Sequence, residues 1–417
     1  MKTPIRAYLL GALSALLVLA GLYFVPPVHR RLAWRVDAAE TTLRMLLHPV
    51  PAAPPAPQEA APVGTAMPAT PLPASPTPTP TLSPTPGPTA TPTPSPTPLP
   101  PQVLLKPPKW ESQDWNNCGP TTLALYLRWW GWQGDQYDIS RVVKPKRRDR
   151  NVNVEELVGF VNTRVRGMSA VYRVGGTLAT LKRVLASGMP VMIEESMMFE
   201  EQYWPNDDRW AAHYLLITGY DDTQGMFTTQ DSFRGPNRLV AYDTLRANWE
   251  AFNFVYILVF PNTRTDAIKA LLGNDWNTDF NRQRALAAMQ QATRQHPDDA
   301  FAWFNLGTNL LYFERYGEAA SAYDHALKIG LPQRFLRYQF GPFIAYFHTA
   351  RFNDLLNLAD YALKVTPNSE EAHLWRGWAL YRLGKKREAI DEFRAALEAN
   401  PHYEDARYAL QFLGARP

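Results

Sequence analysis

The single cysteine of the chain, Cys118, lies in the stretch QDWNNCGPTT, directly before an apolar run with helical spacing. A thiol at the start of a helix meets free backbone amides and the positive end of the helix dipole, and both favour the thiolate. Gly119 leaves room for a substrate beside the sulfur. This setting indicates a nucleophile, whereas an isolated cysteine is more often a small buried apolar side chain.

A thiolate nucleophile needs a base, and His213 in the strand-like stretch HYLLITGY is the candidate. If this stretch and MFTTQDS pair as a hairpin around DDTQG, Asp231 comes to lie beside the His213 ring. A carboxylate there would fix the tautomer while the other ring nitrogen takes the proton from sulfur. Gln113, together with the backbone N–H of Cys118, is a candidate oxyanion hole. The alternatives are a turn-capping aspartate and a surface glutamine.

The elements that must position these side chains lie in residues 108–262. Pro120 suits the first turn of a helix that starts at the thiol, Asn153 and Glu156 form a capping pair, and Thr177 opens LATLKRVLA. VMIEE, HYLLITGY, MFTTQDS and FVYILVFP have the composition of strands. Helices first and antiparallel strands later predict an α+β domain.

Residues 263–417 form an internal repeat of helical pairs. Prolines recur near each unit's end at Pro297, Pro332, Pro367 and Pro401. Two units resemble tetratricopeptide repeats in the matched pairs Gly307/Gly377, Ala319/Ala389, Tyr323/Phe393 and Ala326/Ala396. The small residues let paired helices approach closely and the aromatic residues fill the space between them. We expect an all-α array that binds a protein or peptide partner.

The N-terminal part has a different composition. Residues 7–25, AYLLGALSALLVLAGLYFV, are long and apolar enough for a transmembrane helix, and we assign an anchor to 1–28. A cleaved signal and a buried soluble helix are the alternatives. Residues 29–49 carry apolar side chains at helical spacing among arginines, which predicts a juxtamembrane amphipathic helix. Residues 50–107, rich in Pro and Thr, predict a disordered linker that acts as a spacer and holds an extracytoplasmic domain away from a cell membrane.

Composition excludes several classes of function. The net charge is only +4, and the basic run KPKRRDR at 144–150 is interrupted by Pro145 and Asp149, so we expect a solvated loop and no nucleic-acid partner. One cysteine excludes an internal disulfide framework. The eight histidines show no metal-ligand spacing, so we expect neither a metal nor an organic cofactor.

The motif Q-x4-C-G-P-T before an apolar helix, followed by H-Y-x4-G-Y-D and D-S, resembles the bacteriocin-processing, double-glycine peptidase family within the papain-like cysteine peptidases. The resemblance covers residues 108–262 and implies a papain-like fold. It implies Cys118 as nucleophile, His213 as base, Asp231 as orienting acid and Gln113 at the oxyanion. Many family members are fused to an ABC exporter, whereas this chain has no G-x4-G-K-[ST] phosphate loop.

The resulting hypothesis is a membrane-tethered cysteine peptidase whose repeats recruit a protein or position a peptide. One alternative is a surface scaffold that uses the papain-like unit only to bind peptides. Another is a transglutaminase or acyltransferase, which uses the same three residue types in the same chain order but transfers the acyl group to an amine.

Overall fold

The structure is a computed structural model that describes residues 11, 13–15, 17–18, 21, 23, 25–58, 98–146, 148 and 151–417. Parts of the predicted anchor at 7–25, and the linker from 59 to 97, lie outside the described residues. Within the described part of the chain, no helix has both the length and the apolar character needed to cross a bilayer.

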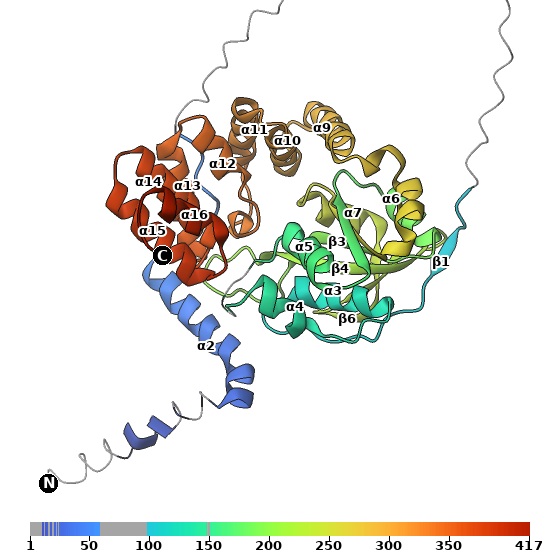
Figure 1. Ribbon diagram of the computed structural model, residues 1–417, viewed down its shortest axis with the longest axis horizontal. Helices are drawn as coiled ribbons and strands as arrows, with labels where there is room; N and C mark the ends of the chain where they lie inside the picture. The colour runs from blue at the N-terminus through green and yellow to red at the C-terminus, as the bar shows by residue number, and fades with distance from the viewer. Residues whose placement is uncertain are drawn as a thin grey trace, which may run out of the picture.

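The catalytic candidates lie on a mixed domain built around a seven-stranded sheet (Figure 1). Its main path runs β2-β7-β3-β4-β5-β6, and β1 pairs with β4 at one end. The strands are β1 (Gln102–Leu104), β2 (Met168–Arg173), β3 (Val191–Met198), β4 (Trp210–Asp221), β5 (Met226–Asp231), β6 (Gly235–Ala241) and β7 (Tyr256–Pro261), and all pairs are antiparallel. The predicted strands are present, while β2 and β6 were not predicted and β1 lies within the range assigned to the linker.

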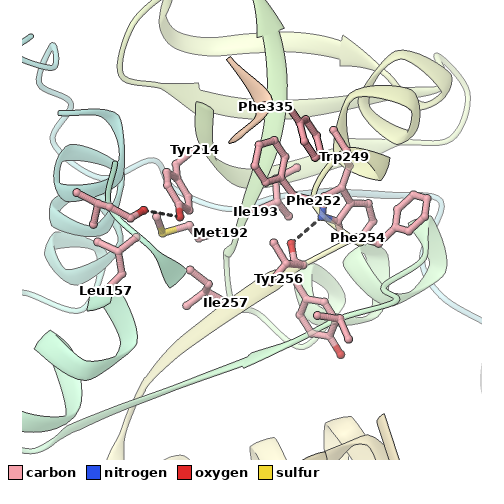
Figure 2. Packing of buried hydrophobic residues seen from close by; sticks show 14 of the residues in the cluster. Leu157, Met192, Ile193, Tyr214, Trp249, Phe252, Phe254, Tyr256, Ile257 and Phe335 are labelled. Atoms are coloured by element: carbon pink, nitrogen blue, oxygen red, sulfur yellow. Dashed lines mark hydrogen bonds between the residues drawn. The ribbon is translucent and has the colours of Figure 1, made fainter. Parts of the chain in front are cut away.

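Five helices surround this sheet: α3 (Cys118–Trp129), α4 (Gln136–Val143), α5 (Val154–Arg164), α6 (Leu178–Ala186) and α7 (Tyr242–Glu250). Asn153 and Glu156 form the expected capping box of α5, and the Thr177 side chain accepts from Thr180 N–H at the start of α6. Helices on both faces bury every residue of the central strand β3 except Met198. Figure 2 shows part of this core, in which Met192, Ile193 and Ile257 pack among aromatic side chains.

An all-helical array follows the sheet domain and curves beside it (Figure 1). It is reached through η1 (Asn262–Arg264), α8 (Thr265–Leu272) and η2 (Gly273–Trp276). The array consists of α9 (Thr278–Gln295), α10 (Ala300–Tyr312), α11 (Tyr316–Ile329), η3 (Phe335–Arg337), α12 (Gly341–His348), α13 (Phe352–Val365), α14 (Glu370–Arg382), α15 (Lys386–Ala399) and α16 (Glu404–Phe412). A mixed sheet domain followed by helical repeats agrees with the predicted fold class.

The repeat glycines are where the sequence pattern requires them. A Cβ atom on Gly307 of α10 would lie 2.6 Å from the Tyr323 ring of α11, and one on Gly377 of α14 would lie 2.5 Å from the Phe393 ring of α15. Neither distance is compatible with a real Cβ contact. Each aromatic ring therefore occupies the space that its partner glycine leaves open, as the small-to-large pairing in the sequence predicted.

The array is also joined to the sheet domain by a buried ion pair and by aromatic packing. Both terminal nitrogens of the Arg334 guanidinium contact the Asp207 carboxylate, at 2.5 and 2.7 Å, and the two side chains are almost fully buried. The Phe335 ring lies 5.4 Å from the Trp210 ring at the start of β4. Figure 2 shows Phe335 beside Phe252 of the sheet domain.

Helix α2 (Pro26–Leu47) and the extended residues 49–58 pack against both domains, although they precede the Pro/Thr-rich run. Thr42 Oγ1 of α2 donates to the Tyr203 carbonyl at 2.7 Å, and Met45 is buried in the main core. The Gln58 N–H donates to Asp354 Oδ1 of α13 at 2.7 Å. Since β1 pairs with β4 beyond the run, elements on both sides of it contact the same folded body. The run therefore does not separate α2 from that body, which corrects the expected spacer role.

Candidate active site

Cys118 is the first residue of α3, as the sequence predicted, and its side chain is partly exposed. A buried glutamine fixes the loop that precedes it. Gln136 Oε1 of α4 accepts from the Asn117 side chain and the Asp114 N–H, both at 2.7 Å, and from Thr121 Oγ1 at 3.0 Å. The loop and the first turn of α3 are thus tied to one acceptor, which holds the thiol at the helix N-terminus.

His213 and Asp231 meet at the end of the β4–β5 hairpin. The ladder runs as far as Leu216 opposite Gln230. Just beyond it, His213 Nε2 lies 2.9 Å from Asp231 Oδ1, and both side chains are buried. The same carboxylate oxygen accepts the backbone N–H groups of Phe233 and Arg234, at 2.7 and 2.9 Å. The contact expected from hairpin arithmetic is therefore present in the structure.

The charges of the thiol, the ring and the carboxylate reinforce one another. Burial by itself would raise the pKa of Cys118, but the hydrogen bond with His213 and the positive charges of His213 and Lys144 outweigh it and lower this pKa below 9.0. Burial would likewise lower the pKa of His213, but the hydrogen bonds with Asp231 and Cys118 outweigh it and raise this pKa to about 10. The lowered pKa of Cys118 and the raised pKa of His213 both favour a thiolate beside an imidazolium near neutral pH.

Gln113 is fixed by a residue to which the sequence reasoning gave no role. Ser232, the serine of the D-S motif, donates from Oγ to Gln113 Oε1 at 2.9 Å, and its carbonyl accepts the Gln113 N–H at 2.9 Å. Because the amide oxygen is occupied by Ser232, the Gln113 NH₂ group is the end that remains to donate to a substrate. Gln113 also lines the cavity next to the site.

Two further charged residues near the site were not singled out from sequence. Lys144, the first residue of the basic run expected to be a solvated loop, is buried and donates from Nζ to the Asn116 carbonyl at 2.6 Å. Glu195 of β3 lies directly opposite His213 in the sheet and is buried. Burial raises the pKa of Glu195 to about 7, against the opposing charge of His213. Two adjacent glutamates in the mostly apolar strand VMIEESMM were the available signal for Glu195.

The structure thus joins His213 and Asp231 by a hydrogen bond, places the Cys118 thiol near enough to the His213 ring for the two to shift each other's pKa, and places Gln113 in the loop that leads to the thiol. Among the described residues, no group of three or more His, Cys, Asp or Glu side chains is arranged to hold a metal ion.

Comparison with known proteins gives the class of the two domains. Residues 105–257 match the family model described as Peptidase C39 like family. Residues 281–332 and 370–403 match tetratricopeptide repeat models. The resemblance inferred from the motifs is confirmed, since the chain carries a C39-like peptidase domain followed by tetratricopeptide repeats.

Individual relatives are distant. A C39-like peptidase from Bacillus anthracis is 16% identical, with a TM-score of 0.31 over 39% of this chain and 98% of that protein. The peptidase domain of Streptococcus ComA, a bifunctional ABC transporter, is 12% identical, with a TM-score of 0.28 over 38% of this chain and 98% of that domain. The mouse protein O-mannosyl-transferase TMTC3 is 27% identical over 41% of this chain. The chain spans about a fifth of the length of this curated relative.

Proposed function

We propose that this protein is a cysteine peptidase that cleaves a peptide bond with Cys118, His213 and Asp231. The observation that carries the proposal is the 2.9 Å contact between His213 Nε2 and Asp231 Oδ1, together with the hydrogen bond of the same ring to Cys118 at the N-terminus of α3. Since Nε2 is engaged by Asp231, Nδ1 is the nitrogen that faces the thiol. This is the arrangement a thiolate–imidazolium pair requires.

The reaction follows from these positions. The Cys118 thiolate attacks the substrate carbonyl carbon, and the resulting oxyanion is stabilised by the Gln113 amide and the Cys118 backbone N–H. The His213 imidazolium gives its proton to the leaving amine as the C–N bond breaks, which leaves a thioester. His213 then takes a proton from water, the hydroxide adds to the thioester carbonyl, and departure of the thiolate regenerates the pair.

We also propose a membrane anchor for the chain and a binding partner for its repeats. The apolar sequence of residues 7–25 supports an anchor in a cell membrane, with the folded domains on the extracytoplasmic side. On α2, Leu32, Val36, Leu43 and Leu47 are exposed, while Thr41 and Met45, on the opposite face, are buried against the body. An exposed apolar stripe next to arginines suits the surface of a bilayer. The repeats would supply a surface for a protein or peptide partner.

The test is to incubate the full chain with a peptide library and to compare wild type with Cys118→Ala. We expect cleavage by wild type only, and selective labelling of Cys118 by iodoacetamide near neutral pH. Equal turnover by the alanine variant would contradict the proposal. Adding a primary amine separates hydrolysis from acyl transfer, because a transferase would form an amide with the added amine instead of a free acid.

A further inference from the structure

A cavity of about 520 Å³ lies beside the candidate active site, where three parts of the chain meet. The loop before Cys118 contributes 113–116, and the segments after β3 and β5 contribute aromatic residues. Helix α2 contributes Asp37, Ala38 and Thr41, and the repeat domain contributes Arg334 and Arg337. A volume of this size is within the range of ligand sites in proteins. The α2 and repeat walls come from outside residues 105–257, which match the peptidase family model.

The walls of this cavity are held in place by specific contacts. Thr42 Oγ1 fixes α2 to the Tyr203 carbonyl at 2.7 Å, one turn from the lining residue Ala38. The Arg334–Asp207 ion pair fixes the repeat domain to the segment after β3, and the Arg334 guanidinium stacks 4.0 Å above the Trp204 ring. The cavity is thus formed by the assembled chain, and not by the sheet domain alone.

The residues that line the cavity favour an apolar ligand. Five aromatic residues line the cavity: Trp115, Phe199, Tyr203, Trp204 and Phe233. The Phe199 ring lies 5.0 Å from Tyr203 and 6.3 Å from Phe233, both in edge contacts. The positive charge of Arg334 is balanced by Asp207, and Arg337 Nε donates to Thr366 Oγ1 at 2.9 Å. The carboxylates of Asp37 and Asp114 also line the cavity, but the five aromatic rings dominate its wall and suit a large apolar side chain better than an ion.

The cavity adjoins the reacting groups, although Cys118, His213 and Asp231 are not themselves part of its wall. Gln113, the candidate oxyanion donor, is part of its wall, and Asn116 lies two residues before the thiol. The Phe233 ring, also in the wall, lies 6.5 Å from the His213 ring in an edge contact. A peptide whose carbonyl lies at Cys118 therefore has a neighbouring residue within reach of the cavity.

From these contacts we infer that the cavity binds a large apolar or aromatic side chain of the peptide on which Cys118 acts. The inference rests on the proposed function and names its substrate class. It also gives α2 and the repeat domain a direct part in substrate selection, since each supplies a wall of the same site.

The test uses a matched pair of substitutions on α2 in the full chain. Ala38→Trp places an indole in the cavity, whereas Ala39→Trp adds the same side chain at an exposed neighbouring position. Substrates are peptides that differ at one position near the cleaved bond, with Phe, Leu, Ala or Asp there. For wild type and Ala39→Trp, we expect kcat/KM to be highest with Phe or Leu. Ala38→Trp should lose about tenfold or more of that preference, mainly through KM.

Two controls separate failure of this inference from failure of the proposed function. The melting temperature and the iodoacetamide labelling rate of Cys118 should match between the two tryptophan variants, which shows that Ala38→Trp folds. Binding of the same uncleaved peptides to Cys118→Ala, with and without Ala38→Trp, is measured by calorimetry. If Cys118→Ala binds the Phe peptide and the added Ala38→Trp abolishes this binding, the proposed role of the cavity is supported even when wild type cleaves none of the peptides. Cleavage with an unchanged Phe preference in Ala38→Trp overturns it.

Discussion

Replacement of Asp231 by asparagine tests the electrostatics of the site most directly. Asp231 Oδ1 lies 2.9 Å from His213 Nε2 inside the protein, and this contact helps to raise the pKa of His213 to about 10. The asparagine side chain would keep an acceptor oxygen for the ring and for the Phe233 and Arg234 amides, but it would remove the charge. A hydrogen bond to a charged group is worth about 1.5 to 3 kcal/mol and a neutral one about 0.5 to 1.5 kcal/mol, so the exchange loses roughly 1 to 1.5 kcal/mol, and about 1.4 kcal/mol corresponds to one pH unit. The pKa of His213 should therefore fall by roughly one.

The assay is the pH dependence of kcat/KM with a cleaved peptide. His213 must be protonated to supply the leaving amine, so activity in wild type should decline as the pH rises through about 10. In Asp231→Asn this alkaline limb should move to lower pH by roughly one, while activity at neutral pH, where His213 stays protonated in both proteins, should change much less. Asp222→Asn, at the opposite end of the same hairpin, removes a partly exposed carboxylate that pairs with Lys182 and should leave the limb in place.

The pH dependence of the unfolding free energy is an independent test of the contact between His213 and Asp231. The pKa of His213 is raised from 6.5, so its protonated form stabilises the folded state fully below about pH 6.5, and this contribution is lost as the pH rises through about 10. The difference in unfolding free energy between wild type and Asp231→Asn, measured in urea, should thus be larger at pH 6 than above pH 10. Alkaline limbs that coincide for the two proteins, with an equal stability difference at both pH values, would refute the assigned role of Asp231.

Two further predictions concern the oxyanion and the repeats. Gln113→Ala should lower kcat about 100-fold or more by removing a donor to the transition state, while stopped-flow iodoacetamide labelling of Cys118 should proceed at the wild-type rate; equal kcat values would contradict this role. Gly377→Ala should destabilise the protein by about 1 to 3 kcal/mol in thermal unfolding, because its Cβ would lie 2.5 Å from Phe393. Gly159→Ala, in a helix with nothing within 4 Å of the added carbon, should instead leave stability unchanged or raise it by up to about 1 kcal/mol.

Features fixed by local chemistry could be predicted from the sequence. The helix start at Cys118, the Asn153 capping box and the glycine–aromatic pairs of the repeats depend on residues that are close in the chain or in a regular repeat. The contact between His213 and Asp231 also followed from the sequence, because a short hairpin brings the far ends of its two strands together, even though the pairing shifts by one residue between Gly219 and Ile217.

Features that depend on distant packing were missed. The basic run predicted a solvated loop, yet Lys144 is buried because the loop before Cys118 offers it the Asn116 carbonyl. The position of Glu195 opposite His213 depends on how β3 pairs with β4, across a segment with no short hairpin. The docking of α2 depends on surfaces more than 150 residues away, such as the Tyr203 carbonyl. No local pattern encodes such contacts.

The docking of both flanks of the Pro/Thr-rich run has an evolutionary consequence. Gln58 is held on α13 and Gln102 on β4, so the number of residues between them does not set the distance from α2 to Cys118. Doubling the number of residues between two fixed points of a chain costs only about 0.6 kcal/mol of chain entropy. Proline–threonine units can accordingly be gained or lost in related genes without altering the reach of the protein.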